Sequence, residues 1–218
     1  AIRESPETIE DVLMIKLHNA DCLDAMRLME DDSFELAIVD PPYGMKQLGA
    51  QTGGKTKKFT DKAFNREAIA NWDIAPKAEY FEHLMRVSKN QIIWGGNYFD
   101  LPPTRCIICW DKCQPWLNFS QWEMAWTSYR STASMFKFDN RTGGKIHPTQ
   151  KPVALYTWLL ERYAKPNDRI LDTHLGSGSI AIAAHNLGYD LTGYELDKDY
   201  YQAAQKRLKN HQKQLRLF

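Results

Sequence analysis

The sequence predicts an α/β protein built around a mainly parallel β-sheet with helices on both faces. Short apolar runs alternate with segments whose apolar residues recur at helical spacing, a pattern typical of strands joined by crossover helices. The runs are continuously apolar, as expected for strands buried on both faces. The chain has 218 residues, enough for one such domain to bury a core without disulfides or metals. We therefore expect a single domain over residues 1–218.

Seven apolar runs are predicted as strands and five segments as helices. The predicted strands are Met14–Leu17, Leu36–Val39, Gln91–Trp94, Cys106–Trp110, Met124–Trp126, Arg169–Leu171 and Leu191–Tyr194. The predicted helices are Asp24–Glu30, Ala78–Val87, Pro152–Tyr163, Ser179–Asn186 and a polar segment from Tyr200 to Leu208 or beyond. Asp24 is a candidate N-cap, and Gly188 is a candidate C′ residue. Residues 45–76 and 111–147 have no regular pattern, and long irregular segments in compact domains are usually functional or disordered.

Composition places the chain among ordinary globular proteins. Hydrophobic residues make up 43% and charged residues 25% of the sequence, which excludes a disordered or collagen-like chain. No apolar run approaches the ~18 residues of a membrane helix, and the polar start contains no signal-peptide core. We therefore expect a cytoplasmic protein with no membrane partner. The formal net charge is +1, so a polyanion would have to be held by a local basic patch.

A local basic patch follows the second predicted strand. Residues 45–66 contain six basic side chains and one acidic side chain, Asp61. We interpret this patch as a nucleic-acid contact, although charged loops are more often simply solvated. The candidate DNA-binding residues are Lys46, Lys55, Lys57 and Lys58. A second basic stretch, 206–216, ends the chain.

Three of the four cysteines lie close together, at 106, 109 and 113. Cys106 and Cys109 fall within one predicted strand, where alternation points them to opposite faces. This placement favours small buried residues over zinc ligands, which usually come in pairs on turns. We predict no metal site.

The segment Asp40-Pro41-Pro42-Tyr43 directly follows a predicted buried strand. The two prolines remove two N–H donors and restrict two φ angles, so the strand ends there. Carbonyl oxygens and one carboxylate are left exposed beside an aromatic ring. Such a rigid set of acceptors next to a stacking surface suits a planar group that carries an NH2.

A glycine-rich loop, Gly176-Ser177-Gly178-Ser179, joins a predicted strand to a helix. With Glu195 about 20 residues further on, it loosely matches a dinucleotide fingerprint. Asp172 argues against that ligand, because it would face a pyrophosphate of like charge. A sulfonium or ammonium would instead be attracted to Asp172, and Glu195 can accept both hydroxyls of a ribose. The two carboxylates together indicate S-adenosylmethionine.

Several segments together resemble the amino-group DNA methyltransferases. Asp40-Pro41-Pro42-Tyr43 resembles their catalytic motif, and His147-Pro148-Thr149-Gln150-Lys151-Pro152 is similar to the segment before their cofactor loop. Asn19-Ala20-Asp21-Cys22 resembles an N-terminal motif, and residues 87–97 are similar to small phage- or prophage-type adenine members. The catalytic motif precedes the cofactor loop, as in the permuted β class. The resemblance, over roughly residues 16–208, implies a Rossmann-like S-adenosylmethionine-dependent methyltransferase fold with a seven-stranded sheet.

The resemblance also assigns roles to individual residues. The catalytic residues would be Asp40, Pro41, Pro42 and Tyr43. The cofactor-binding residues would be Asp21, Cys22, Asp40, Thr149, Gln150, Lys151, Asp172, His174, Gly176, Gly178, Ser179, Glu195 and Leu196. It implies that Lys151 reaches the cofactor carboxylate and Asp21 the cofactor adenine, with a solvated lysine and a turn cap as the alternatives. His174 stands where the family commonly has phenylalanine.

The sequence thus predicts methyl transfer from S-adenosylmethionine to N6 of a flipped-out adenine in double-stranded DNA. Asp40 and the Pro41 carbonyl would accept the two amine hydrogens, while Tyr43 stacks on the base. Segments 45–76 and 111–147 are the candidate DNA-recognition loops. N4-cytosine methylation, RNA adenine methylation, a nicotinamide-dependent oxidoreductase and a catalytically silent nucleic-acid-binding protein are the alternatives. A homodimer and a cognate restriction enzyme stay open as partners.

Overall fold

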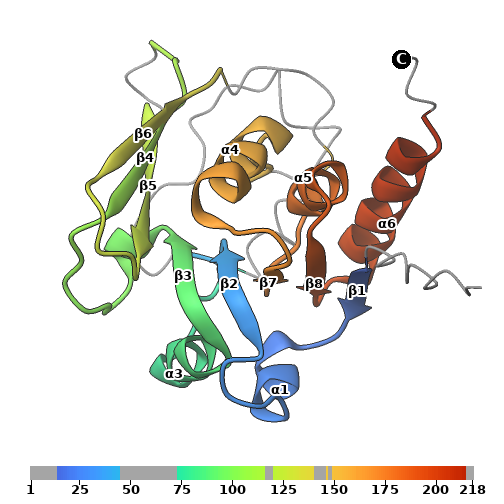
Figure 1. Cartoon of the computed structure of the whole chain (residues 1–218), viewed down its shortest axis with the longest axis horizontal. Coiled ribbons are helices and arrows are strands. Elements are labelled where there is room, and N and C mark those ends of the chain that lie inside the picture. The colour runs from blue at the N-terminus through green and yellow to red at the C-terminus, as the bar shows by residue number, and fades with distance from the viewer. Residues whose placement is uncertain (1–13, 45–72, 116–119, 140–145, 147–148, 215–218) are drawn as a thin grey trace, which may run out of the picture.

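The computed structural model describes residues 14–44, 73–115, 120–139, 146 and 149–214. They form one eight-stranded sheet with helices on both faces (Figure 1). The strand order is β1-β8-β7-β2-β3-β5-β4-β6. Neighbouring strands are parallel except at β5, which runs antiparallel to both β3 and β4. No helix in the described ranges is long and apolar enough to cross a membrane.

All seven predicted strands are present. The strands are β1 (Ile15–Asn19), β2 (Phe34–Val39), β3 (Ser88–Trp94), β4 (Ile107–Asp111), β5 (Trp122–Thr127), β6 (Ser134–Lys137), β7 (Arg169–Asp172) and β8 (Asp190–Glu195). The prediction of seven strands was one too few, because β6 lies in the stretch 111–147 that we expected to be irregular. β6 has only four residues and alternates between half-buried and exposed positions at the sheet edge, so it leaves no apolar run in the sequence.

The helices follow the predicted order. They are α1 (Cys22–Arg27), α3 (Ala78–Val87), α4 (Val153–Tyr163), α5 (Ser179–Leu187) and α6 (Lys198–Gln212), with a 3-10 turn, η1 (Gly96–Tyr98), after β3. The predicted N-cap Asp24 was wrong: Asp21 is extended and its carboxylate accepts the amides of Leu23 and Asp24. Gly188 ends α5 at φ 77°, as its candidate C′ role requires.

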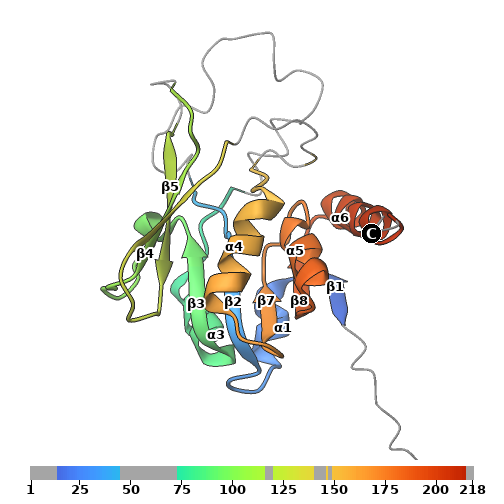
Figure 2. The ribbon, with the colours of Figure 1, turned by 45° about the horizontal axis from the view of Figure 1, so that its top comes forward.

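The two faces of the sheet bury separate cores. On β2, Leu36 and Ile38 pack in the cluster that contains α4, α5 and α6. The alternate residues Ala37 and Val39 pack in the cluster with α1 and α3. Figures 1 and 2 show these two groups of helices on opposite sides of the strands. This double coverage explains why the central strands are apolar at nearly every position.

The parallel strands β1, β8, β7 and β2 all end at the same edge of the sheet. Asn19 at the end of β1 is in register with Glu195 at the end of β8. Asp172 ends β7, and Asp40 directly follows β2. Ligands of open α/β sheets bind beyond such carboxyl ends, so the fold gathers these acidic side chains where a ligand would bind.

Candidate functional site

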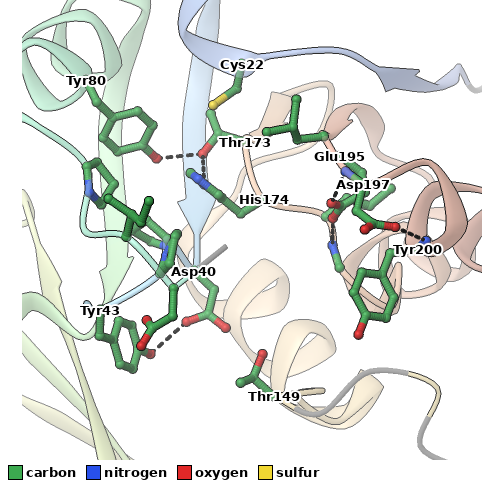
Figure 3. Close-up of a pocket in the computed structure, with 18 of the residues that line it drawn as sticks. Cys22, Asp40, Tyr43, Tyr80, Thr149, Thr173, His174, Glu195, Asp197 and Tyr200 are labelled. Atoms are coloured by element: carbon green, nitrogen blue, oxygen red, sulfur yellow. Dashed lines mark hydrogen bonds between the residues drawn. The ribbon is translucent and has the colours of Figure 1, made fainter. Parts of the chain in front are cut away.

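A cavity of about 950 Å³ lies at the carboxyl ends of β1, β2, β7 and β8. Its size falls within the roughly 300–1,000 Å³ range typical of small-molecule sites. Figure 3 shows Asp40 and Tyr43 on one side of it, Glu195 on the other, and His174 between them. The cavity therefore brings together the segment after β2 and the acidic end of β8.

Asp40 and Tyr43 form a rigid pair after β2. The Tyr43 hydroxyl donates to Asp40 Oδ1 at 2.7 Å, and burial raises the pKa of Tyr43 well above its ordinary value. The Tyr43 ring stacks on Tyr98, with centroids 5.0 Å apart. A Cβ added at Gly95 would lie 2.2 Å from the Tyr43 ring, and Gly95 has φ +69°. Only glycine fits there, and one face of Tyr43 is already covered by Tyr98.

Lys151 lies inside the site, so the alternative of a solvated lysine is wrong. Its side chain is only 2% exposed, and its Nζ lies 2.5 Å from Asp40 Oδ2 and 3.2 Å from Glu123 Oε2. Burial by itself would lower the pKa of Lys151, but the negative charges of Asp40 and Glu123 raise it. The ammonium is therefore a permanent partner of both carboxylates.

Asp172 is a buried acid at the end of β7, with 2% of its surface exposed. Burial raises its pKa to about 8, and the charges of Asp40 and Glu195 act in the same direction. The backbone amide of His174 donates to Asp172 Oδ1 at 3.0 Å and partly opposes the increase. A buried acid with so high a pKa favours a cation as its neighbour.

Glu195 shapes the opposite wall of the cavity. One of its oxygens accepts the amide of Gly176 at 2.8 Å, and the other accepts the amide of Asp197 at 2.9 Å. These bonds fix the carboxylate while leaving lone pairs for hydroxyl donors. Leu196 is 71% exposed and Ile74 is 61% exposed, and both line the cavity. Carboxylate and apolar side chains together suit a ribose joined to a flat base.

His174 is fixed by a chain of hydrogen bonds within the cavity wall. The Tyr80 hydroxyl lies 2.6 Å from Thr173 Oγ1, which lies 2.9 Å from His174 Nδ1 (Figure 3). Burial lowers the pKa of His174 to about 4, so the imidazole is neutral at neutral pH. A neutral ring at this position can pack against a ligand as an aromatic side chain would.

The predicted site residues fall into four groups. Those that line the cavity are Asp21, Cys22, Asp40, Pro41, Pro42, Tyr43, Thr149, Gln150, Lys151, His174, Gly176, Glu195 and Leu196. Burial raises the pKa of the Cys22 thiol to about 12, so it stays protonated. Asp172 is buried directly behind this wall. Gly178 and Ser179 lie away from the cavity: Gly178 packs against Ala204, and Ser179 accepts from Arg207. Lys46, Lys55, Lys57 and Lys58 lie outside the described residues.

Glu123 and Asp73 are two of the polar cavity residues that sequence reasoning missed. Glu123 lines the cavity from β5 and pairs with Lys151, and Asp73 accepts the amide of Gly44 at 2.9 Å. Glu123 is the one acidic residue in an otherwise apolar run, Trp122-Glu123-Met124-Ala125-Trp126, which was the only sequence signal for it. Asp73 carries no signal of its own.

Comparison with known proteins finds similarity to DNA methylases. Residues 118–206 match the N6_N4_Mtase family model, which is described as a DNA methylase. This match spans the segment from just before β5 to within α6. Over 93% of its length it is 25% identical to the type II methyltransferase M.HinfI of Haemophilus influenzae, of which the match covers 70%. The resemblance seen in its motifs is thus confirmed.

Solved methylase structures share the fold. The cytosine-N4-specific PvuII DNA methyltransferase superposes with a TM-score of 0.61 at 12% identity, covering 94% of this chain and 89% of that one. The complex of M1.HpyAVI with S-adenosylmethionine has a TM-score of 0.54 at 22% identity, covering 89% of this chain and all of that one. The predicted Rossmann-like methyltransferase fold is therefore confirmed.

Proposed function

We propose that this protein is a DNA methylase that transfers a methyl group from S-adenosylmethionine to N6 of adenine in DNA, with Asp40 as the acceptor of the substrate amine. Two acidic walls of one cavity support the proposal. Glu195 lines the wall suited to a nucleoside with a cation, Asp172 is buried behind it, and Asp40 lines the wall suited to an amine. One cavity could thus hold the methyl donor, S-adenosylmethionine, beside the methyl acceptor, the target base.

The residues fit S-adenosylmethionine, which supplies an electrophilic methyl group when bound. Glu195 would accept the ribose hydroxyls, and the apolar side chains of Leu196 and Ile74 would cover the adenine. The buried carboxyl of Asp172 would be stabilised in its ionised form by the sulfonium charge. A pyrophosphate would meet repulsion from Asp172, so the same residues disfavour a nicotinamide dinucleotide.

The acceptor side would orient a poor nucleophile. The lone pair of an exocyclic amine is delocalised into the base, so the nitrogen must be rehybridised before it can attack. Asp40 and the Pro41 carbonyl would accept its two hydrogens and direct the lone pair toward the methyl group. The target base would have to leave the duplex to reach this cavity. Because displacement is direct, Cys22 would take no covalent part, in keeping with its protonated thiol.

The observation that carries the proposal is the carboxylate of Asp40, held by Tyr43 and Lys151 in the cavity that Glu195 also lines. The test is incubation of the protein with DNA and labelled S-adenosylmethionine, followed by mass spectrometry of the nucleosides. N6-methyl-2′-deoxyadenosine from the DNA is the expected product. Absence of any methylated nucleoside across varied DNA and RNA substrates would overturn the proposal.

N4-cytosine methylation is the second candidate, since the PvuII enzyme that shares the fold is titled cytosine-N4-specific. Cytosine N4 is also an exocyclic amine beside a ring nitrogen, and Asp40 could accept its hydrogens in the same way. The nucleoside analysis separates the two bases directly, because N4-methylcytosine and N6-methyladenine differ in mass. An RNA substrate would appear in the same experiment as label in RNA alone.

A further inference from the structure

Four charged side chains form one network at the base of the cavity. Lys151 Nζ contacts Asp40 Oδ2 at 2.5 Å and Glu123 Oε2 at 3.2 Å, and Lys112 pairs with the other oxygen of Glu123. The side chains of Lys151 and Lys112 are 2% and 10% exposed. The network therefore alternates in sign and balances two positive charges with two negative charges.

We propose that Glu123 is a positioning residue for methyl transfer, acting through Lys151 to control how firmly that ammonium holds Asp40. The inference rests on the proposed function, because it takes Asp40 as the acceptor of the substrate amine. Glu123 comes from the antiparallel strand β5, outside the catalytic segment. It need not touch the base to act.

The physical reason is competition for one carboxylate. Asp40 already accepts the Tyr43 hydroxyl at Oδ1 and the Lys151 ammonium at Oδ2. A charged donor binds a carboxylate more strongly than a neutral amine does, so Lys151 alone would exclude the substrate amine from Asp40. Glu123 gives the ammonium a second charged acceptor. Lys151 is then shared between two carboxylates, and Asp40 keeps room for the amine.

The charge of Glu123 persists under assay conditions. Burial by itself would raise the pKa of Glu123, but Lys151 and Lys112 more than offset burial and lower it to about 2. Replacing Glu123 by glutamine therefore removes a full negative charge. Lys151 is left with Asp40 as its only anionic partner in the network, and the network acquires a net charge of +1.

Lys112 provides a change in the opposite direction. It pairs with Glu123 on the side away from Asp40 and lies 5.5 Å from the centroid of the Trp110 ring. Without Lys112, Glu123 interacts with Lys151 alone and draws it further from Asp40. If methyl transfer required only that the buried network be intact, replacing Glu123 and replacing Lys112 would lower kcat equally.

The experiment measures kcat for DNA methylation and cofactor affinity in five variants, one of them a double variant and one a control. Glu123→Gln should lower kcat by about tenfold, within the range of coupled charged neighbours, with cofactor affinity unchanged and a lower melting temperature, because two buried lysines lose their shared anionic partner. Lys112→Met should keep kcat at or above that of the parent. In the Lys151→Met background, adding Glu123→Gln should change kcat less than about twofold, because no ammonium remains to be shared. Glu35→Gln is the matched control, since Glu35 also anchors an ion cluster, with Lys89 and Arg169.

Three results would overturn the inference. They are parental kcat in Glu123→Gln, an equal loss of kcat in Lys112→Met, and an undiminished effect of Glu123→Gln in the Lys151→Met background. If Lys151→Met is itself inactive, the test rests on the two single variants, because kcat should fall in Glu123→Gln and should not fall in Lys112→Met. If the unmodified protein methylates DNA and Glu123→Gln has the same kcat, the role of Glu123 is refuted and the proposed function stands. A parent that methylates nothing refutes the proposed function as well.

Discussion

The sheet consists of two parts that differ in strand direction and therefore contribute residues to the cavity from opposite ends of their strands. In the parallel part, β1-β8-β7-β2-β3, the acidic residues stand at the carboxyl ends of strands. In the other part, β5 runs antiparallel to β3, with Ala125 opposite Trp94. Glu123 near the start of β5 therefore reaches the edge where β3 ends. A search of the sequence for polar residues at the carboxyl ends of strands finds the acids of the parallel part. It misses Glu123, because an antiparallel strand places its amino end at that edge.

The largest effect should come from the parallel part. Asp40→Ala removes the acceptor of the substrate amine, and we expect DNA methylation to fall at least about 100-fold, as when a group that contacts the reacting atoms is removed. Cofactor binding, measured by calorimetry, should change little. Asp100→Ala is the control, because Asp100 is an exposed acid after η1. Near-parental turnover in Asp40→Ala would remove this residue from the mechanism.

The next effect concerns the end of β8. Glu195→Gln should weaken S-adenosylmethionine binding about 10- to 100-fold, since a hydrogen bond to a charged group contributes roughly 1.5–3 kcal/mol. Calorimetry measures the loss. Asp190→Asn is the matched control at the other end of the same strand, where Asp190 accepts the amide of Met14. Equal affinities in the two variants would contradict the assignment of the cofactor to this edge.

Cofactor affinity should also depend on pH through Asp172. Burial raises the pKa of Asp172 to about 8, so the carboxyl is mostly neutral below that pH. A sulfonium favours the ionised form, so affinity should rise about tenfold per pH unit as the pH approaches 8 from below, and then level off. Asp172→Asn should abolish this dependence. A parent whose affinity is flat between pH 6 and 9 would count against a cation beside Asp172.

The smallest expected effect concerns the basic patch 45–66, which lies outside the described residues. Replacing Lys55, Lys57 and Lys58 with alanine should reduce the log–log salt dependence of DNA binding by up to about three units if all three contact phosphate. Affinity should fall similarly for every DNA sequence, because phosphate contacts carry no sequence information. Filter binding across salt concentrations measures this effect. An unchanged slope would shift the DNA contact to the segment 111–147 or to α6.

The sequence by itself determined the fold class, the order of the elements and most of the cavity wall. Continuous apolar runs marked the central strands because both faces of the sheet are buried, and Ala78–Val87 was predicted to the residue. Asp40, Asp172 and Glu195 were found because local sequence reveals where a strand ends. Strands, helices and strand ends are recognisable in this way because each depends on residues that are adjacent in the sequence.

Only the tertiary structure decided which charges meet. Lys151 looked like a solvated lysine or a cofactor ligand, yet it is buried between Asp40 and Glu123, which are separated from it by 111 and 28 positions in the chain. The Tyr43 ring lies against Gly95, although 52 positions separate them in the chain, and it leaves no space for a Cβ. Ion pairing and close approach between such distant residues depend on strand order and direction, and both are set by the packing of the whole sheet.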